Sequence, residues 1–147
     1  MLATLLSLLL AQTWLAASDI HLDAFDRSPA PSRYGRDAGP ALFDSALAEM
    51  RSAVPNPAVV VIAGDFLVHD LAGHARRRGT LPADRVAIET MRRIAAAFGR
   101  AYPKAQFAIA LGNNDAACGD YRSSDASPYL AAVARIWAPL VERRGAA

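Results

Sequence analysis

Three short apolar runs in this chain are each followed directly by a cluster of polar residues. The runs cover residues 14–18, 58–63 and 106–111, and they are continuous rather than alternating. Continuous apolar runs of this length are typical of strands that are buried on both faces of a parallel sheet. The polar clusters are therefore predicted to meet beyond the carboxyl ends of these strands, where open α/β sheets keep their sites.

Helical periodicity fills the segments between and after these runs. Apolar residues recur on one helical face over residues 40–53, where Pro55 sets the end, and over residues 81–102. A third helix is predicted over residues 127–143, with Pro128 in its first turn. Strand and helix alternate three times, which predicts an α/β fold in which helices cover a mostly parallel sheet.

Two connecting segments, residues 23–39 and 69–80, are longer than a compact α/β unit needs, and we expect both to be loops. The second contains three consecutive arginines at positions 76–78, which we interpret as a solvated turn, with phosphate contact as the alternative. His74 in the same segment is interpreted as a surface residue.

Composition narrows the classes of function. A chain of 147 residues with 53% hydrophobic content has enough apolar mass for one core, which excludes disorder for most of it. Sixteen basic and fourteen acidic residues leave a net charge of +2, which does not indicate a nucleic-acid binder. The single cysteine, Cys118, excludes an internal disulfide and a cysteine-cluster zinc site. It is expected to be a free buried thiol or to pair outside this chain.

The first eleven residues form an apolar run of the length of a signal-peptide core, too short for a membrane-spanning helix of about 20 residues. We expect a signal peptide over residues 1–12 and a domain over residues 13–147, with no transmembrane span in the mature chain. This reading places the protein outside the cytoplasm, secreted or periplasmic. A buried first helix and a false start codon are the alternatives.

The polar clusters supply oxygen and imidazole groups that suit a divalent cation. Residues i and i+2 of a strand point to the same side, so Asp19 and His21 are predicted to aim at one point. Asp65 adds a carboxylate that can bridge two cations, and Asn113 adds an amide oxygen. Such ligands suit Mn, Fe, Zn, Ca or Mg without selecting among them. Each cluster alone is typical of a polar turn, but their common position after three apolar runs indicates a metal site.

The order and spacing of these clusters resemble the calcineurin-like metallophosphoesterase superfamily, and within it the acid-sphingomyelinase-like branch. The resemblance covers roughly residues 14–122 and is carried by residues 18–23, Tyr34-Gly35, residues 64–70 and residues 111–115. It implies a four-layer α/β/β/α sandwich and two divalent metal ions, Zn, Mn or Fe, that activate water to hydrolyse phosphoesters. By this resemblance Asp19 and His21 hold the first metal, Asp65 bridges both, and Asn113 holds the second.

The chain departs from the family pattern at the residue after Asn113. The family usually has a proton-donating histidine there, whereas this chain has Asn114, and an amide is no acid. His69 is then the candidate acid, and Asp115 is expected to orient Asn114 or the loop. A similar Gly-Asn-Asn-Asp occurs in endopolyphosphatase-like members, whose phosphate leaving group needs less protonation, so a phosphoanhydride hydrolase is one alternative.

The later lone histidine and Gly-His-x-His of the family are also absent, because no histidine follows His74. We therefore expect the chain to be the N-terminal half of the sandwich domain, and an inactive fragment that keeps its ligands is a further alternative. The substrate stays open between a small phosphoester, a lipid headgroup and a polyphosphate. A nucleotide-binding loop and a Gly-x-Ser-x-Gly nucleophile are not present in the sequence.

Overall fold

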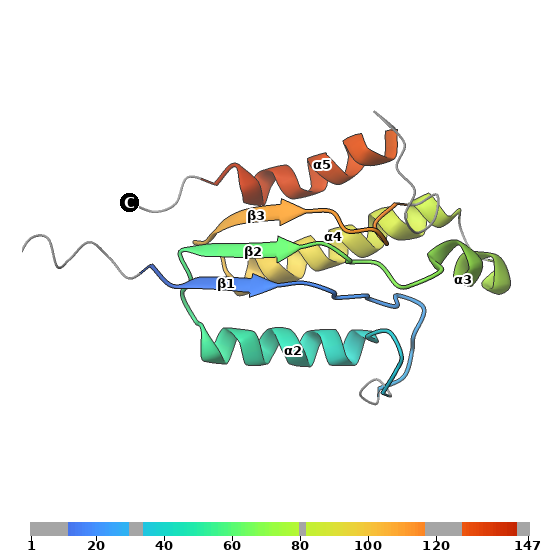
Figure 1. The fold of residues 1–147 in the computed structure, drawn as a ribbon, viewed down its shortest axis with the longest axis horizontal. Helices are drawn as coiled ribbons and strands as arrows, with labels where there is room; N and C mark the ends of the chain where they lie inside the picture. Colours follow the sequence, from blue (N-terminus) through green and yellow to red (C-terminus); the bar gives the residue numbers. More distant parts are fainter. Residues whose placement is uncertain (1–11, 30–33, 80–81, 117–127, 144–147) are drawn as a thin grey trace, which may run out of the picture.

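The computed structural model describes residues 12–29, 34–79, 82–116 and 128–143. These residues form a mixed α/β fold with a three-stranded sheet and four helices (Figure 1). In chain order the elements are β1 (Trp14–Ala17), α2 (Pro40–Ala53), β2 (Val59–Ala63), α3 (Leu71–Arg78), α4 (Ala83–Ala101), β3 (Gln106–Ala110) and α5 (Pro128–Val141). The α/β class is thus confirmed.

The three strands are parallel and lie in the order β1-β2-β3. Their register aligns Ala17 with Ile62 and Ile62 with Ile109, so the strands end at nearly the same level. All three point the same way in Figure 1, and the loops that follow them leave from one edge of the sheet. The expected parallel sheet is therefore present, with its polar clusters at a common edge.

Helix α4 packs behind the sheet and contributes more residues to the described core than any other element (Figure 1). Its inner face consists of buried apolar residues that recur at helical spacing, among them Met91, Ile94 and Phe98. From the sheet, alternate residues such as Val60 and Phe107 are buried against it. Helices α2 and α5 flank α4, with Phe43 of α2 at 6.2 Å from the Phe98 ring.

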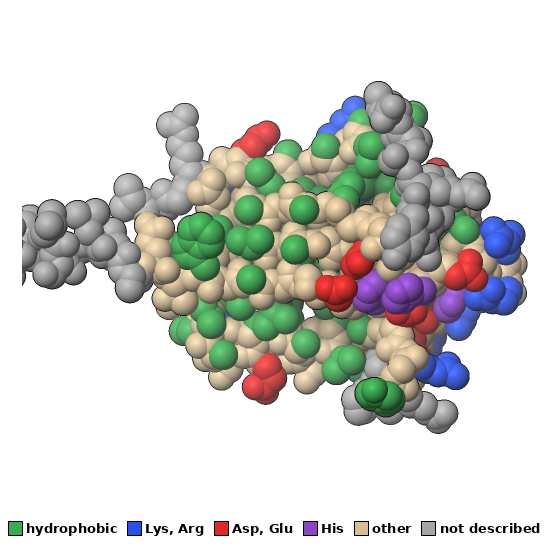
Figure 2. Space-filling view, in the orientation of Figure 1, with side chains coloured by type: hydrophobic (Ala, Val, Ile, Leu, Met, Phe, Trp, Pro, Cys, Tyr) green, Lys and Arg blue, Asp and Glu red, His purple; other side chains and the backbone are tan. Residues whose placement is uncertain are grey.

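The opposite face of the sheet is open, so the prediction of strands buried on both faces is wrong for the described residues. Every second residue along the strands is exposed or half-buried, and Trp14 at the start of β1 is 62% exposed. Figure 2 shows apolar side chains spread over this face. A run of alanine and valine is apolar whether the strand is covered on one face or on both, so the sequence does not distinguish the two cases.

Three predicted helices are confirmed with small differences in their ends. Helix α2 has the predicted bounds. Helix α4 (Ala83–Ala101) lies within the predicted range 81–102, and α5 (Pro128–Val141) lies within the predicted range 127–143. The expected loop at residues 69–80 is wrong, because α3 occupies most of it. The Asp70 side chain accepts a hydrogen bond from the Gly73 N–H and caps this helix, and the arginines at positions 76–78 form its last turn rather than a turn in a loop.

The proposed signal peptide and Cys118 fall outside the described residues, except for Gln12. Among the helices that the structure describes, none is both long and apolar enough to cross a membrane.

The open sheet face can be tested through the two tryptophans of the chain. Trp14 is exposed, whereas Trp137 is 3% exposed and packs 5.2 Å from the Phe66 ring. Acrylamide should quench the wild-type fluorescence in two components, and the strongly quenched one should vanish in Trp14→Phe. Equal and weak quenching of both tryptophans would show that another surface covers this face in solution.

Candidate metal centre

The loops that follow β1 and β2 run side by side and continue the backbone pairing of the sheet. The Asp19 N–H donates to the Gly64 carbonyl at 3.2 Å, and the His21 N–H donates to the Asp65 carbonyl at 2.9 Å. One residue later, the Leu22 N–H donates to the Phe66 carbonyl at 2.9 Å. These hydrogen bonds hold the first two polar clusters next to each other.

Three of the predicted ligands lie on left-handed backbone. Asp19, His21 and Asp65 have φ values of 54°, 41° and 55°. Strand β1 ends at Ala17, so the argument that Asp19 and His21 share one side of a strand is wrong in its premise. Their side chains nevertheless approach each other, because the left-handed residues redirect the chain after the strand. Non-glycine residues are uncommon in this conformation, which makes three of them in one cluster a marker of a functional site.

The side chains of Asp19, His21 and Asp65 converge. One ligand atom from each residue lies within 4.8 Å of the others. The His21 Nε2 atom is 3.8 Å from the Asp19 Oδ1 atom, too far for a hydrogen bond. Two ligands that each lie about 2.0–2.2 Å from one ion can be separated by up to about 4 Å, so the gap suits a cation between them. The structure thus brings the three residues together as the sequence predicts.

The ring of His21 is held from its other nitrogen. Its Nδ1 atom lies 3.2 Å from the Leu67 carbonyl oxygen and 3.3 Å from the Asn114 side-chain nitrogen. A carbonyl oxygen only accepts, so the shorter contact, to Leu67, is a hydrogen bond only with a proton on Nδ1, which leaves a lone pair on Nε2 of the neutral ring. In this tautomer the Asn114 NH₂ group touches Nδ1 without donating to it. This is the tautomer that a metal ligand needs at Nε2.

Asp115 joins the loops after β2 and β3. Its fully buried carboxylate accepts four backbone N–H bonds, at 2.7–3.2 Å. The donors are the N–H groups of Asp65, Phe66, Leu67 and Gly112. Burial raises the pKa of the Asp115 carboxyl, while the four N–H groups favour its charged form and act in the opposite direction. Asp115 therefore orients the loops, which agrees with one of the two roles expected for it.

The asparagines of the third cluster lie against the same loops. The Asn114 N–H donates to the Asp65 Oδ1 atom at 3.0 Å, and the Asn113 side chain donates to the Asn114 Oδ1 atom at 3.1 Å. Asn114 is 3% exposed. The two glycines permit this close approach, because a Cβ at Gly64 would collide with the backbone of Gly112, and a Cβ at Gly112 with the Asp65 carboxylate.

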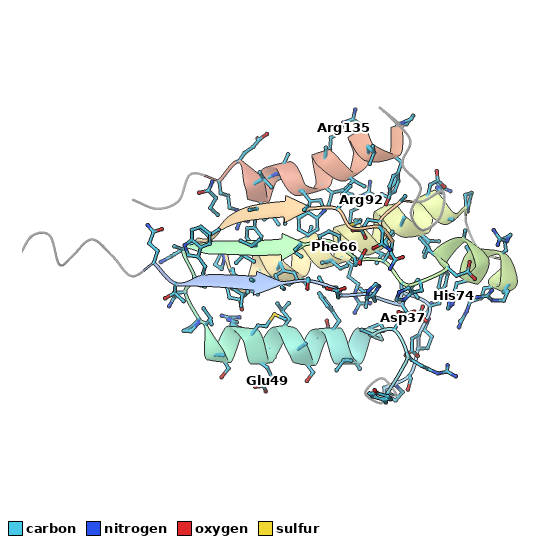
Figure 3. All side chains as sticks on the ribbon, viewed as in Figure 1. Asp37, Glu49, Phe66, His74, Arg92 and Arg135 are labelled. Carbon is cyan, nitrogen blue, oxygen red and sulfur yellow. The ribbon has the colours of Figure 1, made fainter. Side chains whose placement is uncertain are left out.

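A cleft of about 1090 Å³ opens beside these residues, lined by Asp19, His21, Asp37, His69, His74 and Arg78 among others. Figure 2 shows acidic and histidine side chains gathered there, and Figure 3 places Asp37 and His74 beyond the ends of the strands. No pattern in the sequence points to Asp37. His74 lies on α3 and not in a loop as expected, and its partly exposed side chain has its Nδ1 atom 4.0 Å from the Asp23 carboxylate.

Comparison with known proteins finds no family model that matches this chain and no curated protein that matches it significantly.

Replacing Asp115 by asparagine tests its role in joining the loops. The amide keeps the shape but turns an NH₂ group toward backbone N–H donors, so Asp115→Asn should lower the free energy of unfolding by about 2–4 kcal/mol. Asp44→Asn is the matched control, since that carboxylate is exposed on α2, and it should change stability by no more than about 0.5 kcal/mol. Urea denaturation measures both, and equal midpoints would contradict the assigned role.

Proposed function

We propose that this chain carries the metal site of a hydrolase that cleaves phosphoester bonds with metal-activated water. The observation that carries the proposal is the convergence of Asp19, His21 and Asp65 at the carboxyl edge of a parallel sheet, on left-handed backbone. The likeness of the three polar clusters to calcineurin-like metallophosphoesterases supports the same reaction. Both arguments point to the same residues.

The donor set fits a divalent cation such as Zn, Mn or Fe, because it combines carboxylates with an imidazole whose Nε2 lone pair is free for a ligand bond. Asp19 and His21 would hold the first metal, and Asp65 would bridge to a second metal held also by Asn113. For this second metal the described residues offer fewer ligands than for the first. The proposed binuclear centre therefore needs donors beyond those that the structure brings together here.

When bound, the metals would lower the pKa of a shared water and screen the charge of the phosphate. The residues of the chain have separate tasks. Asn114 is buried and contacts both His21 and Asp65, so it positions ligands instead of transferring protons. His69 lines the cleft and is the proposed proton donor for the leaving oxygen. Its exposed ring, with 57% of the side chain accessible, is open to substrate.

The four-layer sandwich of the family that the chain resembles would place a second sheet, from outside the described residues, on the face that is open here. The open apolar face supports it, because Trp14, Val59 and Val61 lie on this face with no described element over them. A sheet face of this composition is typical of the inner layer of a two-sheet packing.

A site that binds a cation without turnover is the second candidate. The described residues that favour it are the same three ligands, since they suffice for one cation but not for two. Phosphoanhydride hydrolysis is a third reading that Asn114 favours, because a phosphate leaving group departs without a strong acid.

Metal titration tests the proposal. Asp65→Asn keeps the acceptor for the Asn114 N–H and suits the left-handed backbone, but loses the carboxylate charge. Changes in outer partners of metal ligands weaken binding about 10–100-fold, so this variant should bind Mn²⁺ or Zn²⁺ at least that much more weakly by calorimetry. Asp44→Asn should bind like the wild type.

Turnover then separates the candidates. Hydrolysis of bis(p-nitrophenyl) phosphate by the metal-loaded wild type, lost in Asp65→Asn, would support the phosphoesterase. Hydrolysis of tripolyphosphate alone would favour the phosphoanhydride reaction. Metal binding without any turnover would favour the non-catalytic site, and absence of metal binding would overturn all three.

A further inference from the structure

Asp37 and His69 form a pair that the metal site does not include. The His69 Nδ1 atom is 2.6 Å from the Asp37 Oδ1 atom, although the two residues are 32 positions apart in the sequence. The Asp37 side chain is 21% exposed and the His69 side chain 57% exposed. Both line the cleft beside the candidate metal ligands.

We infer that Asp37 is a positioning residue that fixes the ring orientation and tautomer of His69 for proton transfer to the leaving oxygen of a phosphoester. This inference rests on the proposed function, because that function supplies the reaction in which His69 would donate the proton. The pairing itself can be measured independently of any reaction.

The backbone of Asp37 is fixed next to the metal ligands. Its neighbour Ala38 donates its N–H to the His21 carbonyl at 3.1 Å and accepts the Asp23 N–H at 2.8 Å. Ala38 also forms a parallel bridge with Leu22. The end of the segment 23–39 therefore pairs with the edge of the sheet. The two backbone hydrogen bonds of Ala38 fix the position of Asp37 directly before it.

His69 is fixed from two other directions. Asp70, directly after it, has a φ of 47° and caps α3, which anchors the backbone on the helix side. On the opposite side the His69 ring stacks on the His21 ring, with centroids 4.2 Å apart and planes inclined by 17°. A ring held by stacking and by one hydrogen bond keeps a defined orientation although it faces the cleft.

The same residues could be considered as a separate cation site, because His21, Asp37 and His69 also have ligand atoms within 4.8 Å of one another. The stacking argues against it. A ring nitrogen donates to a metal in the plane of its ring, and the nearly parallel planes of His21 and His69 do not meet near the rings. One ion cannot lie in both planes, so the short contact is better explained as a hydrogen bond.

The hydrogen bond between Asp37 and His69 determines which ring nitrogen of His69 is available for proton transfer to substrate. A carboxylate only accepts, so Nδ1 carries the proton that Asp37 binds, and Nε2 is the nitrogen left to exchange a proton with substrate. In the proposed step a water oxygen forms a bond to phosphorus and releases a proton to solvent, the P–O bond to the leaving group breaks, and the Nε2 proton of His69 moves to the departing alkoxide oxygen to form the alcohol. The Nδ1 proton stays on His69, hydrogen-bonded to Asp37, and solvent returns a proton to Nε2.

Nitrogen-15 NMR of the imidazole rings tests the pairing in the metal-free chain. The chain has only three histidines, so His69→Gln and His74→Gln assign the signals. In spectra recorded at a pH of about 8.5, wild-type His69 should show a protonated Nδ1. In Asp37→Ala the proton should redistribute toward Nε2, whereas Asp37→Asn, which keeps an acceptor oxygen, should retain the wild-type pattern in part. Two controls apply. The His74 signal should stay the same in Asp37→Ala, and the His69 signal should stay the same in Asp44→Ala.

Leaving-group dependence tests the role in the reaction. With metal bound, Asp37→Ala should slow hydrolysis of a phosphodiester with an alkyl leaving group by about tenfold or more, since general acid catalysis is typically worth 10²–10⁴-fold. Bis(p-nitrophenyl) phosphate, whose leaving group needs no proton, should change by less than about twofold.

The two arms have separate outcomes. An unchanged His69 nitrogen pattern in Asp37→Ala overturns the inference, whatever the activity. A changed pattern with equal slowing of both substrates overturns the positioning role and indicates loss of structure. If the wild type has no turnover, the proposed function fails, and the nitrogen pattern alone then decides whether Asp37 sets the tautomer of His69.

Discussion

The buried carboxylate of Asp115 is the interaction on which the site depends. It gathers backbone N–H groups from the loops after β2 and β3, and Asn114 returns a hydrogen bond to the Asp65 side chain. The loop after β1 is then held by backbone hydrogen bonds to Gly64 and Asp65. The proposed ligands are thus positioned, directly or through neighbouring residues, by a residue that itself does not line the cleft.

The fold could be predicted from the sequence wherever packing follows a regular period. Helices α2, α4 and α5 each place apolar residues on one face, and the apolar runs mark the strands. The open sheet face could not be predicted, because the strand residues on it are mainly alanine and valine, which read as buried. Helix α3 was missed because it is short and ends in three arginines, so few of its residues are buried.

The site was predictable only in part, and for a physical reason. Residues directly after parallel strands are brought to one edge by the sheet itself, which is why Asp19, His21 and Asp65 could be named in advance. Asp37 has no such signal. It lies near the end of a long segment without periodicity, and its position depends on the bridge between Leu22 and Ala38, which only the folded chain reveals.

The left-handed backbone at Asp19 and Asp65 has a consequence for which residue types these positions can hold. Aspartate and asparagine enter this conformation more readily than other side chains with a Cβ, and of the two only aspartate carries a charge that attracts a cation. Local backbone geometry and ligand chemistry therefore make the same choice at each position. Aspartate therefore suits positions 19 and 65 for two independent reasons, the left-handed backbone of the loops and its negative charge.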